Sequence, residues 1–108
     1  MFELCDGDLL SIVENRGLLE ESMARAVFAQ TVAGLRHCHA QGVWHLDVKP
    51  DNLLVAGCDV KVADFGCAST TRCTSTRSGT VEYAAPEVCV CAHFLSWIVF
   101  DAWAQSAW

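Results

Sequence analysis

Polar residues that can do chemistry gather between two apolar segments near the middle of the chain. Asp47, Lys49 and Asn52 lie in one short run, and a further carboxylate, Asp64, follows the next apolar stretch. A carboxylate can accept the proton of a hydroxyl, and an ammonium can neutralise charge that develops on a phosphate. An amide oxygen and a second carboxylate can complete a Mg²⁺ shell. The pattern therefore favours chemistry on a phosphate group.

The segment after Asn52 predicts a β-hairpin. Residues 53–55 and 60–63 are short apolar runs rich in leucine and valine, and residues 56–59 read Ala-Gly-Cys-Asp, which is typical of a turn. A hairpin over residues 53–63 would deliver Asp64 at the end of its second strand.

Two helices are expected before this site. Residues 8–15 form a short apolar pattern that ends near Gly17, a residue that tolerates the left-handed backbone of a helix end. Residues 20–40 predict the longest helix, with Glu20 and Glu21 at its positive N-terminal end. Its apolar residues fall at helical spacing on one stripe: Met23, Val27, Phe28, Thr31, Val32, Leu35 and Cys38.

Four motifs follow one another in the order of a known family. They are H-L-D-V-K-P-D-N at 45–52, D-F-G at 64–66, G-T at 79–80 and A-P-E at 85–87. The chain resembles the catalytic domain of eukaryotic protein kinases of the Ser/Thr type. Residues 100–104, F-D-A-W-A, resemble the start of that family's central helix. The resemblance implies an α+β fold and a partial kinase domain over residues 1–108. This would be a fragment of the helical C-lobe with a small hairpin and no N-lobe.

The resemblance also implies roles for individual residues. Asp47 would orient the substrate hydroxyl and accept its proton, and Lys49 would stabilise the γ-phosphate. Asn52 and Asp64 would hold Mg²⁺. The implied cofactors are ATP and Mg²⁺, and the residues expected around the nucleotide are Glu3, Cys5, Asp8 and Leu54.

The activation segment of the resemblance runs from D-F-G to A-P-E. Residues 67–78 are rich in serine and threonine without an apolar period, which predicts a mobile loop. Thr76 and Thr80 are the residues singled out in this segment, and Thr76, four positions before Thr80, is the position at which the resemblance implies phosphorylation. In this family an arginine usually precedes the catalytic aspartate, and here that position is Leu46. Leucine has no charge and no hydrogen-bond donor with which to bind a phosphate. We therefore expect phosphorylation of Thr76 to have a small effect.

Two classes of function remain open at this point. The first is transfer of the ATP γ-phosphate to Ser or Thr hydroxyls of a protein substrate, with this chain as a partial record such as an incomplete gene product. The second is a non-catalytic binding module with a kinase-like fold. Residues 1–108 contain no glycine-rich phosphate loop, so we expect little activity from these residues alone. A small-molecule phosphotransferase is disfavoured by A-P-E.

Composition excludes several other classes. The net charge of −6 disfavours a nucleic-acid partner, which normally binds a basic surface. Residues 88–100 are apolar but too short to span a bilayer. Seven cysteines show no C-x-x-C pair, and reduced thiols in an intracellular compartment, cytoplasmic or nuclear, are the expectation. The His37-Cys38-His39 run is an unsuitable metal site, because adjacent helical residues point in different directions.

Overall fold

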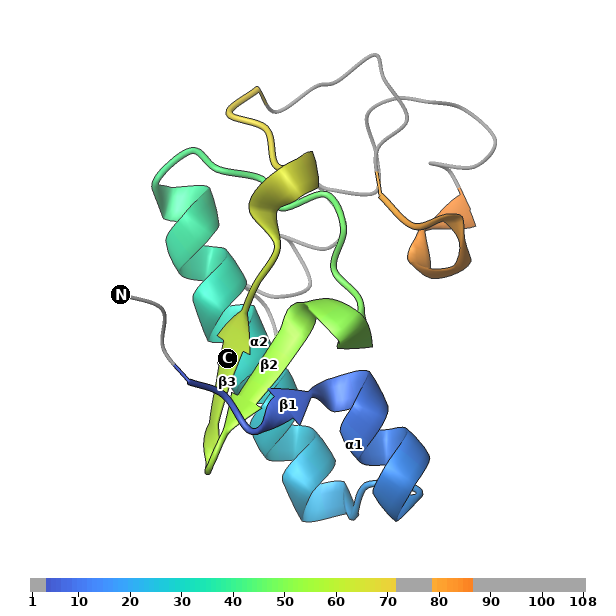
Figure 1. The fold of residues 1–108 in the computed structure, drawn as a ribbon. Helices are drawn as coiled ribbons and strands as arrows, with labels where there is room; N and C mark the ends of the chain where they lie inside the picture. The colour runs from blue at the N-terminus through green and yellow to red at the C-terminus, as the bar shows by residue number, and fades with distance from the viewer. Residues whose placement is uncertain (1–3, 72–78, 87–108) are drawn as a thin grey trace.

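The computed structural model describes residues 4–71 and 79–86. Two helices and a three-stranded antiparallel sheet form this part of the chain (Figure 1). The helices are α1 (Leu9–Arg16) and α2 (Glu21–Ala40), and the strands are β1 (Gly7–Asp8), β2 (Leu53–Ala56) and β3 (Asp59–Val62). The predicted helices and the predicted hairpin are confirmed.

The sheet has the strand order β1-β2-β3. In β2, Leu54 pairs with Asp8 on one side and with Lys61 on the other. Of this sheet, the sequence predicted only the β2–β3 hairpin. Strand β1 has only two residues, too few to show an alternating pattern in the sequence. Its pairing with β2 therefore depends on the tertiary fold.

The ends of α1 follow from two residues with local roles. The Asp8 side chain caps the N-terminus by accepting a hydrogen bond from the Ser11 amide at 2.8 Å. At the other end, Gly17 has a φ of 83° and its amide donates to the Val13 carbonyl. The short helix therefore begins and ends where its capping residues stand.

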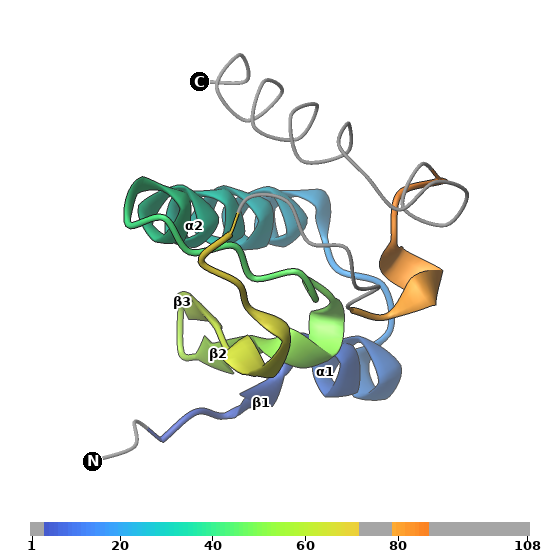
Figure 2. The same cartoon turned by 90° about the horizontal axis from the view of Figure 1, so that it is seen from above.

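The long helix α2 covers one face of the sheet and contacts β3 (Figure 2). Gln30 joins the two elements. Its Nε2 donates to the Cys58 carbonyl at 2.9 Å, and its Oε1 accepts from the Val60 amide at 2.8 Å. These bonds hold the hairpin turn against the helix.

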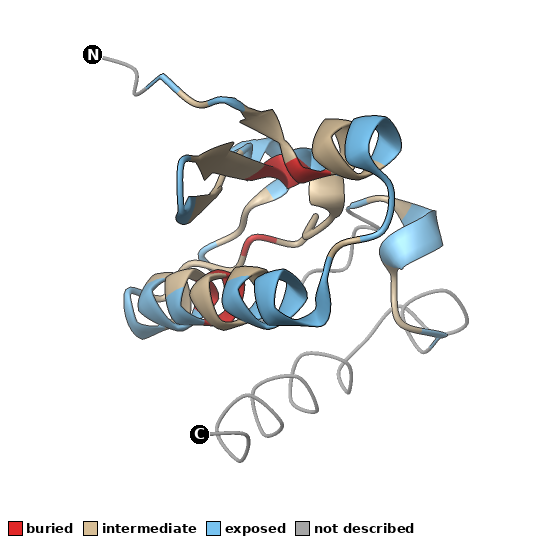
Figure 3. Cartoon of the chain, turned by 90° about the horizontal axis from the view of Figure 1, so that it is seen from below, coloured by how far each residue is buried: buried red, intermediate tan, exposed pale blue. Residues whose placement is uncertain are grey.

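The buried core lies between α2, the start of β2 and the loop that joins them (Figure 3). Its buried hydrophobic residues are Leu9, Val32, Leu35 and Leu53. Of the predicted α2 stripe, Thr31, Val32 and Leu35 are buried, whereas Met23 and Phe28 are 50% and 41% exposed. The stripe is therefore buried only around Thr31–Leu35.

The first residues of the predicted mobile loop are held by the backbone. Trp44 and Ser69 form an isolated antiparallel bridge, with N–H···O distances of 2.8 Å in both directions. Residues 72–78 of that loop and the F-D-A-W-A run lie outside the described residues.

Two expectations from composition can be compared with the described part of the chain. Cys5, Cys38, Cys58 and Cys67 form no disulfide with one another. No helix within residues 4–71 and 79–86 is long and apolar enough to cross a membrane. The apolar run at residues 88–100 lies outside that part of the chain.

Candidate functional site

The loop between α2 and β2 is anchored by a buried histidine. His45 has no exposed surface, and its Nδ1 accepts a hydrogen bond from the Asp47 amide at 3.2 Å. An acceptor at Nδ1 assigns the ring proton to Nε2, which donates to the Ala63 carbonyl at 2.7 Å. The ring also packs on Phe65, with centroids 4.8 Å apart. His45 thus ties the residues before Asp64 to the residues around Asp47.

Asp47 receives two short hydrogen bonds from Thr80. The Thr80 amide and hydroxyl both donate to Oδ1, at 2.7 Å and 2.6 Å. The hydrogen bond from the Thr80 side chain lowers the pKa of Asp47 most; Lys49 acts in the same direction and burial opposes it. The carboxylate is therefore ionised at neutral pH.

Lys49 lies between these two residues. Its Nζ donates to the Thr80 hydroxyl at 2.8 Å and is 3.3 Å from Oδ2 of Asp47. The hydrogen bond to Asp47 raises the pKa of Lys49, and the charges of Asp51 and Asp64 add to it. The site therefore pairs an ammonium with a carboxylate, and a second carboxylate stands close by.

Asn52 is almost fully buried beside Asp47. Its Nδ2 donates to the Asp47 carbonyl at 2.8 Å and to Oδ2 at 3.2 Å. Its backbone carbonyl accepts from the Ala63 amide at 2.9 Å, one residue before Asp64. Asn52 therefore joins the two loops, through its side chain to Asp47 and through its backbone carbonyl to the residue before Asp64.

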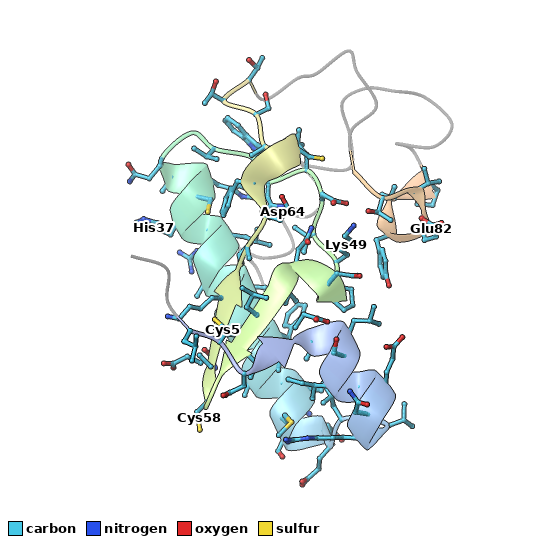
Figure 4. The ribbon with its side chains drawn as sticks, in the orientation of Figure 1. Cys5, His37, Lys49, Cys58, Asp64 and Glu82 are labelled. Atoms are coloured by element: carbon cyan, nitrogen blue, oxygen red, sulfur yellow. The ribbon has the colours of Figure 1, made fainter. Side chains whose placement is uncertain are left out.

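Asp64 follows β3 on a left-handed backbone, with φ 58° and ψ 76°. Its Oδ1 accepts from the Gly66 amide at 3.1 Å, and the residue is exposed. Figure 4 shows Asp64 and Lys49 on neighbouring loops beyond the hairpin. The two oxygens of interest, from Asn52 and Asp64, are hard ligands of the kind that Mg²⁺ takes alongside phosphates.

The residues expected around a nucleotide are only partly brought together. Asp8 and Leu54 are cross-strand partners, and Cys5 precedes β1. Both oxygens of Asp8 accept hydrogen bonds from Ser11, at 2.8 Å each, so its observed role is that of a helix cap. The remaining two predicted site residues, Glu3 and Thr76, lie outside the described residues.

A separate cavity of about 380 Å³ lies between α1, α2 and the hairpin. Its wall includes Leu9, Met23 and Val55 but none of the predicted site residues. Adjacent residues of a strand point to opposite faces, so Val55 and Leu54 serve different sides of β2. This cavity is therefore distinct from the face that carries Leu54.

A model of the protein kinase domain matches residues 1–106 of the chain. The chain belongs to the protein kinase domain family. Named relatives agree with this assignment. Rice CBL-interacting protein kinase 29 is 43% identical over 86 residues, which is 76% of this chain. Mouse testis-specific serine/threonine-protein kinase 3 is 43% identical over 94 residues, which is 82% of it.

The kinase chain spans a minority of each relative. The matched regions are 19% of the rice protein and 35% of the mouse protein. Arabidopsis CBL-interacting serine/threonine-protein kinase 24 is 41% identical over 87 residues, 76% of this chain and 20% of its own length. These comparisons relate the chain to Ser/Thr protein kinases over a part of their length.

The structure adds to this candidate site two residues to which the sequence analysis assigns no role, His45 and Gly79. His45 was part of the H-L-D motif, and the signal for its burial was its position next to an apolar segment. For Gly79, the only signal in the sequence is its place in the G-T pair. Thr80 was expected in the activation segment, and its contact with Asp47 across 33 positions carried no sequence signal.

Proposed function

We propose that this chain contributes the catalytic loop of a Ser/Thr protein kinase, which transfers the ATP γ-phosphate to protein hydroxyls. The elements from β1 to the A-P-E motif would belong to the helical C-lobe of that enzyme. The observation that carries the proposal is the arrangement at Asp47. Its carboxylate accepts a hydrogen bond from the hydroxyl of Thr80, which is the same kind of group as a substrate hydroxyl. The Lys49 ammonium lies 2.8 Å from the oxygen of that Thr80 hydroxyl.

The two oxygens of Asp47 are differently occupied. Oδ1 accepts both short bonds from Thr80, whereas Oδ2 has only longer contacts, 3.2 Å to Asn52 and 3.3 Å to Lys49. Both contacts at Oδ2 come from nitrogen atoms and are longer than the roughly 2.7–2.9 Å of a strong N–H···O⁻ bond. Oδ2 is therefore the more weakly bound oxygen of Asp47, and Asp47 would use it to orient a substrate hydroxyl and to accept its proton as transfer completes.

Lys49 and the metal ligands would handle the phosphate charge. Lys49 is protonated at neutral pH, and the hydrogen bond to Asp47 raises its pKa further. Asn52 and Asp64 fit a Mg²⁺ ion, since they offer an amide oxygen and an exposed carboxylate. When bound, Mg²⁺ with ATP would neutralise the charge on the transferring group. Positioning and electrostatics would supply most of the rate, as phosphoryl transfer needs little covalent help.

A chimera tests the proposal. Residues 4–86 of this chain would replace the matching segment of mouse testis-specific serine/threonine-protein kinase 3, and transfer of phosphate from ATP to a generic protein substrate would be measured. The chimera should be active, and Asp47→Ala should lower kcat by on the order of a thousandfold, as expected when the hydroxyl loses its acceptor. Arg25→Ala is the matched surface control, because Arg25 is exposed and forms an ion pair with the equally exposed Glu21 on the same helix.

The opposite result identifies the alternative function. A chimera that folds, binds ATP with Mg²⁺ and transfers no phosphate would favour a non-catalytic binding module and would refute the proposal. The chain of 108 residues alone should transfer phosphate at a negligible rate. Its sequence lacks the glycine-rich loop, the strand lysine and the helix glutamate that clamp ATP in this family.

A further inference from the structure

Gly79 lies against the backbone of the loop that carries Asp47. A Cβ built on Gly79 would lie 2.2 Å from the Leu46 carbonyl oxygen and 3.3 Å from its carbonyl carbon. Real Cβ atoms essentially never come within 3.0 Å of a neighbouring heavy atom, and a backbone atom cannot rotate away. The chain at Gly79 therefore passes Leu46 at a distance that only glycine permits.

The close approach of Gly79 to Leu46 is adjacent in sequence to the contact between Thr80 and Asp47. Leu46 precedes Asp47, and Gly79 precedes Thr80, whose amide and hydroxyl both reach Oδ1 of Asp47. Gly79 has a φ of 94° and Leu46 a φ of 66°, so both lie in the left-handed region. A side chain other than hydrogen is costly there. The missing side chain of Gly79 thus serves two needs, backbone conformation and contact distance.

We infer that Gly79 is a positioning residue, which lets Thr80 reach Asp47 and so leaves Oδ2 of Asp47 for a substrate hydroxyl. The consequence for catalysis rests on the proposed phosphoryl transfer, whereas the contact itself does not. In Gly79→Ala the Cβ must move from 2.2 Å to beyond 3.0 Å from the Leu46 oxygen. The hydrogen bonds of 2.6 Å and 2.7 Å lie next to this contact, and such bonds weaken steeply when their geometry is lost.

A second glycine gives a matched control. Gly57 has a φ of 61°, and a Cβ there meets nothing within 4 Å. Gly57→Ala therefore carries the cost of a left-handed alanine without a collision. Comparing the two variants separates the effect of contact distance from the effect of backbone conformation.

The first measurement is amide hydrogen exchange at Thr80 in the full chain of 108 residues. Gly79→Ala should speed exchange at Thr80 by at least about tenfold, because its amide loses the Asp47 acceptor. Gly57→Ala should leave Thr80 unchanged. Thr80 protection that survives Gly79→Ala overturns the inference. Loss of protection at Val32 and Leu35 as well would make Gly79 a general structural residue, and it would also overturn the inference.

The second measurement is a double-mutant cycle in the chimera. Gly79→Ala should lower kcat by on the order of a hundredfold with little change in the KM for ATP. Thr80→Val should cause a loss of similar size, and the double variant should be no worse than either single variant, because both act through one contact. Additive losses would overturn the inference. An inactive wild-type chimera would refute the proposed function, while exchange at Thr80 would still decide the role of Gly79.

Discussion

The Asn52 side chain donates to the backbone carbonyl of Asp47 at 2.8 Å, and Asn52 is 5% exposed. Removing a buried donor leaves its acceptor unpaired. Asn52→Ala should lower the free energy of unfolding by about 1–3 kcal/mol in urea denaturation. Asn52→Asp should destabilise the chain further at neutral pH, because a second carboxylate would face Asp47. The exposed neighbour provides the control, and Asp51→Asn should have little effect. Equal stability of the Asn52 and Asn52→Ala chains would contradict the assigned contact.

The buried residues of α2 should contribute more to the stability of the fold than exposed apolar residues do. Leu35 is 2% exposed, and Leu35→Ala should cost about 2–5 kcal/mol because it removes buried methyl groups and leaves a cavity. Leu18 is 96% exposed, so Leu18→Ala should change stability by less than about 0.5 kcal/mol. Chemical denaturation of both variants gives the comparison. Similar losses at the two positions would show that the burial pattern is wrong.

The helix cap of α1 should depend on pH. Hydrogen bonds from the Ser11 amide and hydroxyl lower the pKa of Asp8 below its ordinary 3.8. The folded state therefore favours the carboxylate, and its contribution to stability is complete above about pH 5 and is lost as the pH falls through the lowered pKa. The stability difference between wild type and Asp8→Asn, measured by urea denaturation, should shrink below about pH 4. A difference that grows on acidification would reverse the assigned direction.

Lys49 should matter for turnover more than for nucleotide affinity. Its ammonium contacts Asp47 and the Thr80 hydroxyl. In the chimera, Lys49→Met should lower kcat by on the order of a hundredfold, the usual loss when one donor to developing charge is removed. The KM for ATP should change little. Arg25→Ala removes another cation at an exposed ion pair and should leave kcat as it was. A change confined to KM would place Lys49 in nucleotide binding instead.

The chain should associate through exposed apolar side chains. Leu54 and Trp44 are half-buried and contribute little to such a surface. The most exposed large hydrophobic residues in the described part are Leu4 and Leu18, at 95% and 96%; Val81, Tyr83 and Met23 follow at 67%, 52% and 50%. Exposed apolar surface of this kind promotes association. Sedimentation at tens of micromolar should show oligomers, and Leu18→Glu with Met23→Glu should reduce them and reduce binding of a hydrophobic dye. A wild-type chain that stays monomeric contradicts this prediction.

The local parts of this kinase chain could be predicted from the sequence. Helix α1 begins after Asp8 and ends before Gly17 because capping depends on neighbouring residues. Asp47, Lys49 and Asn52 meet because one short loop carries all three. The hairpin follows from two apolar runs and a turn between them. In each case the contacts are close in sequence, so residue type and spacing determined the outcome.

Only the tertiary structure decided the contacts between distant segments. Thr80 reaches Asp47 across 33 positions, and no periodicity announces such a pair. The requirement for glycine at position 79 arises from the Leu46 carbonyl, which belongs to a different loop. The pairing of β1 with β2 and the exposure of Met23 likewise depend on which surfaces the fold brings together. Hydrogen bonds and steric collisions are sensitive to changes in distance of a few tenths of an ångström. The packing of the whole domain sets those distances.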